Sequence, residues 1–154
     1  MSHLLLFLHI TVMFGAVAIG FGPALLLRLA YQRGQLAAVR GIGIASAMVG
    51  PVIPIGFVVG GLLGLVTAIS FGFNLLAPWL VLAYIGFLIE MVIGFTESRS
   101  RGAELGRLLA STPDGPITPE LKAYFGDRRA NVVLVIEYAV LIALIFDMVA
   151  KPLS

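Results

Sequence analysis

Residues 41–69 read GIGIASAMVGPVIPIGFVVGGLLGLVTAI and contain no charged side chain. A helix needs about 20 predominantly apolar residues to cross the hydrocarbon of a bilayer. This stretch is longer, so it predicts a membrane-spanning helix that is tilted or bent. Pro51 and Pro54 lie inside it, and a proline removes one helical hydrogen bond. We expect a kink there; the alternative is an unwound segment that lines a cavity, as in transporters with broken helices.

Three further apolar stretches flank this one, over residues 4–27, 78–95 and 132–149. Of the 154 residues, 60% are hydrophobic and 12% are charged, whereas a soluble domain carries about a quarter charged residues. The sequence therefore predicts an all-α membrane protein, a bundle of four transmembrane helices in a single domain over residues 1–154. Spans and connections use nearly all of the chain, so no separate extramembrane domain is expected.

The longest connection, residues 97–131, holds most of the charged side chains. A surface helix is predicted over residues 97–110, because its leucines share one face. Residues 112–116 are rich in turn formers and should end that helix. Thr118 and Pro119 are typical of the N-cap and first position of a second short helix, which should end near Phe125.

The basic residues predict the orientation of the chain. Nine of the ten Lys and Arg lie in the first and third connections, and only Lys151 lies outside them. Connections rich in Lys and Arg stay on the cytoplasmic side. We therefore expect both of these connections to be cytoplasmic and both termini to be external, in a multi-pass protein of the bacterial cytoplasmic (inner) membrane.

Several classes of function are excluded by composition or motif. Cysteine is absent, which excludes thiol–disulfide chemistry and thiolate-bound metal centres. No basic run suggests a nucleic-acid surface, and no phosphate loop, nucleophile elbow or catalytic triad is present. Residues 4–27 are longer than the core of a signal peptide and lack a basic segment before them. They are interpreted as the first span.

A ladder of small residues, Gly56, Gly60 and Gly64, repeats every four positions in the second span. Such ladders allow two helix backbones to approach closely. The ladder predicts either packing against another helix of the same chain or contact between copies in a homo-oligomer.

Four ionisable residues lie within the predicted spans, and each needs a reason because a charge in hydrocarbon is costly. The predicted orientation sorts them into two layers. His9 and Asp147 belong to an outer layer, and Glu90 and Glu137 to an inner layer that Arg28 also reaches. Glu137 and Asp147 are expected on different faces of the fourth span.

Glu90 is flanked by glycines four residues away on either side, so its face should pack against another helix. Glu90, Glu137 and Arg28 are candidates to bind a cation or polar ligand or to relay protons. The alternative is a structural role, with Glu90 paired to Arg28 or protonated, and with Glu137 reaching the headgroups. His9 is a candidate ligand of haem b or a proton shuttle, or a neutral imidazole bonded to a neighbouring helix.

The first span carries Leu8-His9-Ile10 and, near its end, Leu27-Arg28-Leu29. This pattern resembles a family of small bacterial four-helix membrane proteins of unknown function. It is more distantly similar to copper-resistance D-type proteins and to the J-type protoporphyrinogen oxidase. The latter resemblance implies haem at His9 and a supporting basic residue in a later span, where this chain has Glu90.

Three hypotheses of function follow from the sequence. The first is an accessory or structural subunit of a membrane complex, or a homo-oligomer, without enzymatic activity. The second is a small transporter or channel that moves protons or cations through Glu90 and Glu137. The third is a haem-associated redox protein that uses His9. The sequence names neither a substrate nor a partner.

Overall fold

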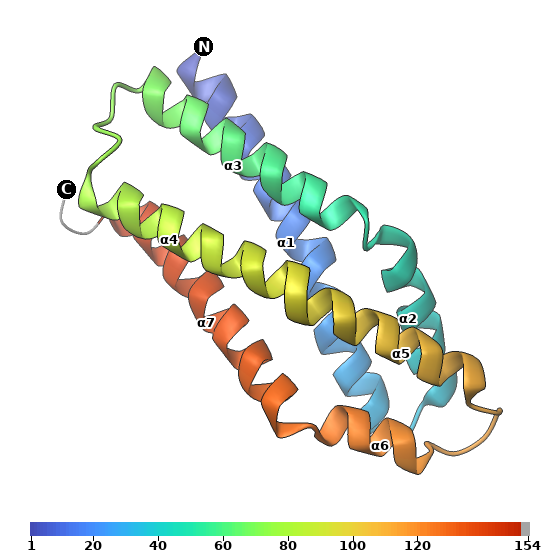
Figure 1. The fold of residues 1–154 in the computed structure, drawn as a ribbon. Helices are drawn as coiled ribbons and strands as arrows, with labels where there is room; N and C mark the ends of the chain where they lie inside the picture. Colours follow the sequence, from blue (N-terminus) through green and yellow to red (C-terminus); the bar gives the residue numbers. More distant parts are fainter. Residues whose placement is uncertain (152–154) are drawn as a thin grey trace.

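The computed structural model describes residues 1–151, and this part of the chain contains helices and no strand. The helices, in chain order, are α1 (Ser2–Gln32), α2 (Leu36–Val49), α3 (Val52–Ser70), α4 (Pro78–Ile93), the π-helix η1 (Gly94–Ser98), α5 (Arg99–Ser111), α6 (Pro119–Gly126) and α7 (Arg128–Ala150). The chain starts and finishes at the same end of an elongated bundle, whereas α2, α5 and α6 gather at the opposite end (Figure 1).

Four helical stretches are long and apolar enough to cross a membrane: Ser2–Gln32, Val52–Ser70, Pro78–Ser111 and Arg128–Ala150. The all-α class and four such helices, both predicted from the sequence, are thereby confirmed. Their outward faces carry large exposed apolar side chains such as Phe14, Leu88 and Phe146. A helix that faces lipid keeps such side chains outside, because hydrocarbon is as apolar as they are.

The prediction of a single span over residues 41–69 is wrong, but the bend predicted within this stretch at its prolines is present. The helix breaks at Gly50 and Pro51, so α2 and α3 are separate helices. Pro51 has no backbone N–H, and its ring would clash with the carbonyl one turn earlier in a continuous helix. Both residues at the break keep right-handed helical backbone angles, so the chain bends sharply there without unwinding. Pro54 lies in the first turn of α3, where an N–H needs no helical partner.

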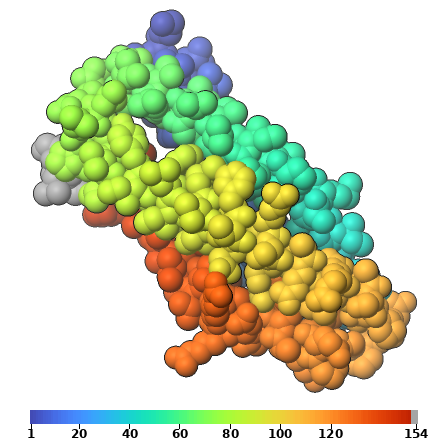
Figure 2. All heavy atoms as spheres, in the orientation of Figure 1, coloured from blue at the N-terminus to red at the C-terminus, as the bar shows by residue number. Residues whose placement is uncertain are grey.

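The predicted surface helix over residues 97–110 is continuous with the third span instead of separate from it. α4 passes through the π-helix η1 directly into α5. Figure 2 shows α4 and α5 as one ridge along this face, with α3 on one side and α7 on the other. The short helix predicted after Thr118 is present as α6, and the Thr118 hydroxyl accepts a hydrogen bond from the Leu121 N–H.

We call the end of the bundle opposite the termini the basic cap. It has its own apolar core. The buried residues are Ala30 of α1, Leu36 and Val39 of α2, Leu105 and Leu109 of α5, and Leu121 of α6. Val39 and Leu121 are the largest fully buried side chains described. The loop residues thus fold onto the ends of α1, α2 and α5 and form the most enclosed part of the molecule.

Charged and aromatic side chains close the surface of the basic cap. Arg101 lies 3.9 Å from the centre of the Tyr124 ring and pairs with Asp127 at 3.1 Å. Burial raises the pKa of the Tyr124 phenol, so the hydroxyl stays protonated, and it donates to the Arg101 carbonyl oxygen at 3.1 Å. Arg40 pairs with Asp114 across the cap. These contacts hold α6 in place between α5 and α7.

Within the spans, the helices form two pairs: α1 packs along α3, and α4 packs along α7. Contacts between the pairs are sparse. The Phe57 and Phe87 rings lie 6.5 Å apart between α3 and α4, and the Tyr138 hydroxyl of α7 donates to the Phe21 carbonyl oxygen of α1 at 3.0 Å. The basic cap therefore joins two helix pairs that make few contacts with each other along the four long helices.

Leu121→Ala should lower the free energy of unfolding by about 3 kcal/mol, because a fully buried leucine is removed from the core of the basic cap. The change would be measured by denaturant titration of the purified protein in detergent micelles. Leu88→Ala is the matched control, since Leu88 is 61% exposed on α4 and should have little effect. Equal losses in the two variants would contradict a packed core in the cap.

Candidate functional site

The contact between α4 and α7 is close at its middle, where Gly86 of α4 meets Leu144 of α7. A Cβ atom added at Gly86 would stand 2.7 Å from Leu144 Cδ2. Glycine permits this approach, because a side chain at position 86 would require Leu144 to move. We call this contact the α4–α7 seam; it also contains Glu90 of α4 and Glu137 and Asp147 of α7.

Three carboxylates are buried in the α4–α7 seam. Glu90 and Asp147 are each 6% exposed, and Glu137 is 8% exposed. No other residue of α7 is buried. Glu137 and Asp147 therefore both turn away from the outside of the bundle, although they lie ten residues apart along α7.

Glu137 has a hydrogen-bond donor within the seam. The Ser98 hydroxyl donates to Glu137 Oε1 at 2.9 Å. Glu90 lies within electrostatic reach of Glu137, but its own Oε1 is buried without a partner. Glu90 and Glu137 are thus buried in the same seam, without a hydrogen bond between them.

The π-helix η1 explains how Ser98 reaches this site. In an uninterrupted α-helix, Ser98 would point about 80° away from Glu90, since each residue turns the helix by about 100°. A π-bulge absorbs one extra residue, which returns Ser98 to within about 20° of the Glu90 direction. The irregularity at residues 94–98 therefore places a hydroxyl on the carboxylate face, and π-bulges are frequent at functional sites.

Asp147 lies at the end of the seam nearest the termini. Both of its side-chain oxygens are buried, and neither has a hydrogen-bond partner within residues 1–151. The nearby cation Lys151 lies instead over the rings of Phe73 and Trp79, at 4.5 and 5.3 Å. Asp147 is thus a second carboxylate without a donor, roughly 15 Å along α7 from Glu137 at 1.5 Å per residue.

Arg28 does not join the two glutamates. Its guanidinium donates to Asn131 Oδ1 at 2.7 Å, and residues 1–151 contain no ion pair between an arginine and Glu90 or Glu137. The prediction that Arg28 shares a site with Glu90 and Glu137 is therefore wrong. Asn131 supplies a neutral acceptor at the same level.

His9 belongs to the other helix pair. Its Nδ1 lies 2.8 Å from the Gly60 carbonyl oxygen, and since a carbonyl only accepts, Nδ1 carries the proton. The ring packs on the α3 backbone, because a Cβ added at Gly64 would stand 2.8 Å from His9 Cε1. The predicted outer layer of His9 and Asp147 is not formed as one site, since the two residues lie in different helix pairs.

The structure does not test the prediction of haem at His9. The bond of His9 to Gly60 uses Nδ1, and such a bond commonly orients a histidine whose other ring nitrogen is a ligand. The second histidine, His3, lies edge-on to Phe71 and does not face His9. Residues 1–151 contain no group of three or more His, Cys, Asp and Glu that could hold a metal ion.

The glycine ladder of α3 faces α1. Cβ atoms added at Gly56 and Gly64 would meet Ala16 and His9 respectively, and Met13 covers Gly60. The ladder therefore serves packing within the chain, which was one of its two predicted roles.

Ser98 and Asn131 were not among the predicted site residues. Nothing in the local sequence separates Ser98 from other serines in a charged loop, because its direction depends on the π-bulge. Asn131 lies at the start of α7, where a polar residue is ordinary; only its contact with Arg28 marks it.

No protein-family model, curated protein or solved structure matches this chain. A proposal for its function therefore depends on the geometry of the site.

Gly64→Ala should destabilise the protein by about 1–3 kcal/mol, because the added methyl group collides with an imidazole held by its bond to Gly60. Denaturant titration in micelles would measure the loss. Gly15→Ala is the control, since a Cβ at Gly15 on α1 meets nothing within 4 Å. That variant should be neutral or slightly stabilised, because alanine favours helix; destabilisation confined to Gly15→Ala would refute the close α1–α3 packing.

Proposed function

We propose that this chain is a multi-pass membrane protein that conducts protons along the α4–α7 seam. The observation that carries the proposal is the pair of carboxylates without donors in that seam. Glu90 Oε1 and both oxygens of Asp147 are buried and have no hydrogen-bond partner. Ionisable groups inside a membrane bundle commonly belong to ion pathways and proton relays.

Energetics favour protons over a bound metal ion. A carboxylate without a donor is costly in an apolar environment, and the neutral acid removes most of that cost. A carboxyl that gains and loses a proton as water reaches it is a relay group. A divalent cation would need several oxygen ligands at once, and the described carboxylates do not converge in groups of three.

The relay has an order along the membrane normal. Asp147 marks the end of the seam near the termini, and Glu137 with its Ser98 donor marks the end near the basic cap. Glu90 lies between them on α4, within electrostatic reach of Glu137. Glu137 and Asp147 are about 15 Å apart along α7, which is longer than a hydrogen bond. In this proposal, water molecules complete the path between the carboxyl groups.

The orientation belongs to the same proposal. The basic cap contains nearly all of the Arg and Lys residues, which supports a cytoplasmic position for the cap and an external position for both termini. Asp147 then exchanges protons with the outside, and Glu137 and Ser98 exchange them with the cytoplasm. The membrane is the bacterial inner membrane if the family resemblance of the first span holds.

Glu90→Gln should reduce proton flux to the level of empty vesicles, because the amide keeps the shape of the side chain but cannot exchange a proton. Flux would be measured with an internal pH dye in liposomes under an imposed membrane potential. Asp147→Asn should give the same loss.

Glu120→Gln is the control for this experiment. Glu120 is an exposed carboxylate of α6, outside the spans, and its replacement should leave the flux unchanged. Wild-type flux no higher than that of empty vesicles, or full flux in both Glu90→Gln and Asp147→Asn, would refute the proposal.

A second function is favoured by the light contact between the helix pairs: a subunit of a membrane complex, either a homo-oligomer or an accessory subunit. On α1 only Ala16 and Ala30 are buried, and on α7 only the two carboxylates. Native mass spectrometry from lipid nanodiscs should then give an assembly of several chains or a constant partner. A single chain without a partner would contradict it, and would leave proton conduction by the monomer untouched.

A further inference from the structure

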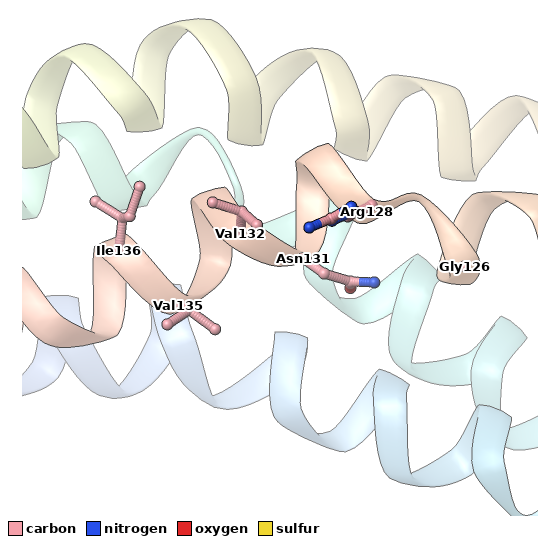
Figure 3. Close-up of a pocket in the computed structure, with 6 residues that line it drawn as sticks. All are labelled: Gly126, Arg128, Asn131, Val132, Val135 and Ile136. Carbon is pink, nitrogen blue, oxygen red and sulfur yellow. The ribbon is translucent and has the colours of Figure 1, made fainter.

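A groove runs along the first two turns of α7, on the side of the molecule shown in Figure 3. It has a volume of about 430 Å³ and is lined by Gly126, Arg128, Asn131, Val132, Val135 and Ile136. It is polar at the end near the basic cap and apolar towards the middle of α7. It lies apart from the α4–α7 seam, whose carboxylates do not line it.

The polar end of the groove carries positive charge that no carboxylate neutralises. Arg128 is exposed and forms no ion pair with any carboxylate of residues 1–151. Arg28 is held beside the groove by its 2.7 Å hydrogen bond to Asn131 and also has no carboxylate partner. The adjacent acid, Asp127, is already engaged by Arg101 at 3.1 Å and by the first N–H groups of α7.

The apolar end of the groove is exposed on the surface of α7. Val132, Val135 and Ile136 are 50%, 67% and 44% exposed. They follow Arg128 on one face of the helix by four, seven and eight residues. At 1.5 Å per residue, they lie about 6–12 Å deeper along the axis of α7 than the guanidinium. A headgroup at Arg128 would therefore have its first acyl carbons beside these three side chains.

We propose that this groove binds an anionic glycerophospholipid, with the phosphate at Arg128 and one acyl chain along Val132, Val135 and Ile136. Charge complementarity and the apolar wall together select this occupant. Arginine suits phosphate because its planar fork donates two parallel hydrogen bonds, and basic residues near a membrane surface attract anionic lipids. A free phosphate would leave the apolar wall bare, and a zwitterionic lipid would bring a cation of its own towards the two arginines and no net negative charge.

Arg128→Gln should weaken the retention of phosphatidylglycerol by about fivefold, as expected for the loss of one basic group near the surface. Native mass spectrometry would count the phosphatidylglycerol and phosphatidylcholine molecules retained by the full chain after release from detergent. Wild type should retain phosphatidylglycerol in preference to phosphatidylcholine. Arg107→Gln is the matched control: Arg107 is exposed on α5, has no ion pair and does not line the groove, so its replacement should leave retention unchanged.

A second pair of variants tests the groove by shape, without changing charge. A Cβ added at Gly126 or at Gly102 meets nothing within 4 Å, so a side chain can begin at either position without a clash. Gly126→Leu should fill part of the groove and lower phosphatidylglycerol retention, whereas Gly102→Leu on α5 should not. Equal retention of the two lipids by wild type would overturn the proposal, and so would equal effects of Arg128→Gln and Arg107→Gln, which would indicate unspecific charge attraction.

Discussion

A carboxylate in hydrocarbon needs shelter from lipid, and this requirement fixes how α7 is rotated about its axis. The helix has two acidic residues, Glu137 and Asp147, and they are also its only two buried residues. Its isoleucines, its phenylalanine and most of its valines face outward instead. α4 provides the sheltering surface, and Gly86 lets the two helices come close enough to enclose the acids. The pairing of α4 with α7 thus follows from the positions of Glu137 and Asp147 on α7.

The two helix pairs treat their buried polar groups differently. In the α1–α3 pair, His9 finds a carbonyl acceptor at Gly60, so the polar contact is complete and the glycines pack tightly around it. In the α4–α7 pair, Ser98 satisfies Glu137, but Glu90 and Asp147 retain oxygens without donors. A buried polar group with a hydrogen-bond partner stabilises a fold, whereas one without a partner is costly unless a proton, a water molecule or a ligand binds to it. This contrast is why the proposal of proton conduction concerns the second pair.

The basic cap links the two helix pairs. Its core is apolar and closed, and several of its charges are paired within it, among them Arg101 with Asp127 and Arg40 with Asp114. Arg128 is an exception, and it stands where the cap meets the apolar face of α7. The same positive charge that orients a chain in the membrane can therefore also give it a defined lipid neighbour.

Hydropathy and composition were enough to predict an all-helical chain with four membrane-crossing helices, because a span is a property of a continuous segment. They also located the buried ionisable residues, since any charge inside such a segment stands out. They failed at Gly50–Pro51, where an apolar run hides the border between a cap helix and a span, and at residues 94–98, where a π-bulge leaves no clear mark in composition. The hydrogen-bond partners of these residues could not be predicted either. Arg28 donates to Asn131 and not to a glutamate, and Ser98 donates to Glu137. Such pairings depend on helix rotation and on which helices are neighbours, and these emerge only when all the segments pack together.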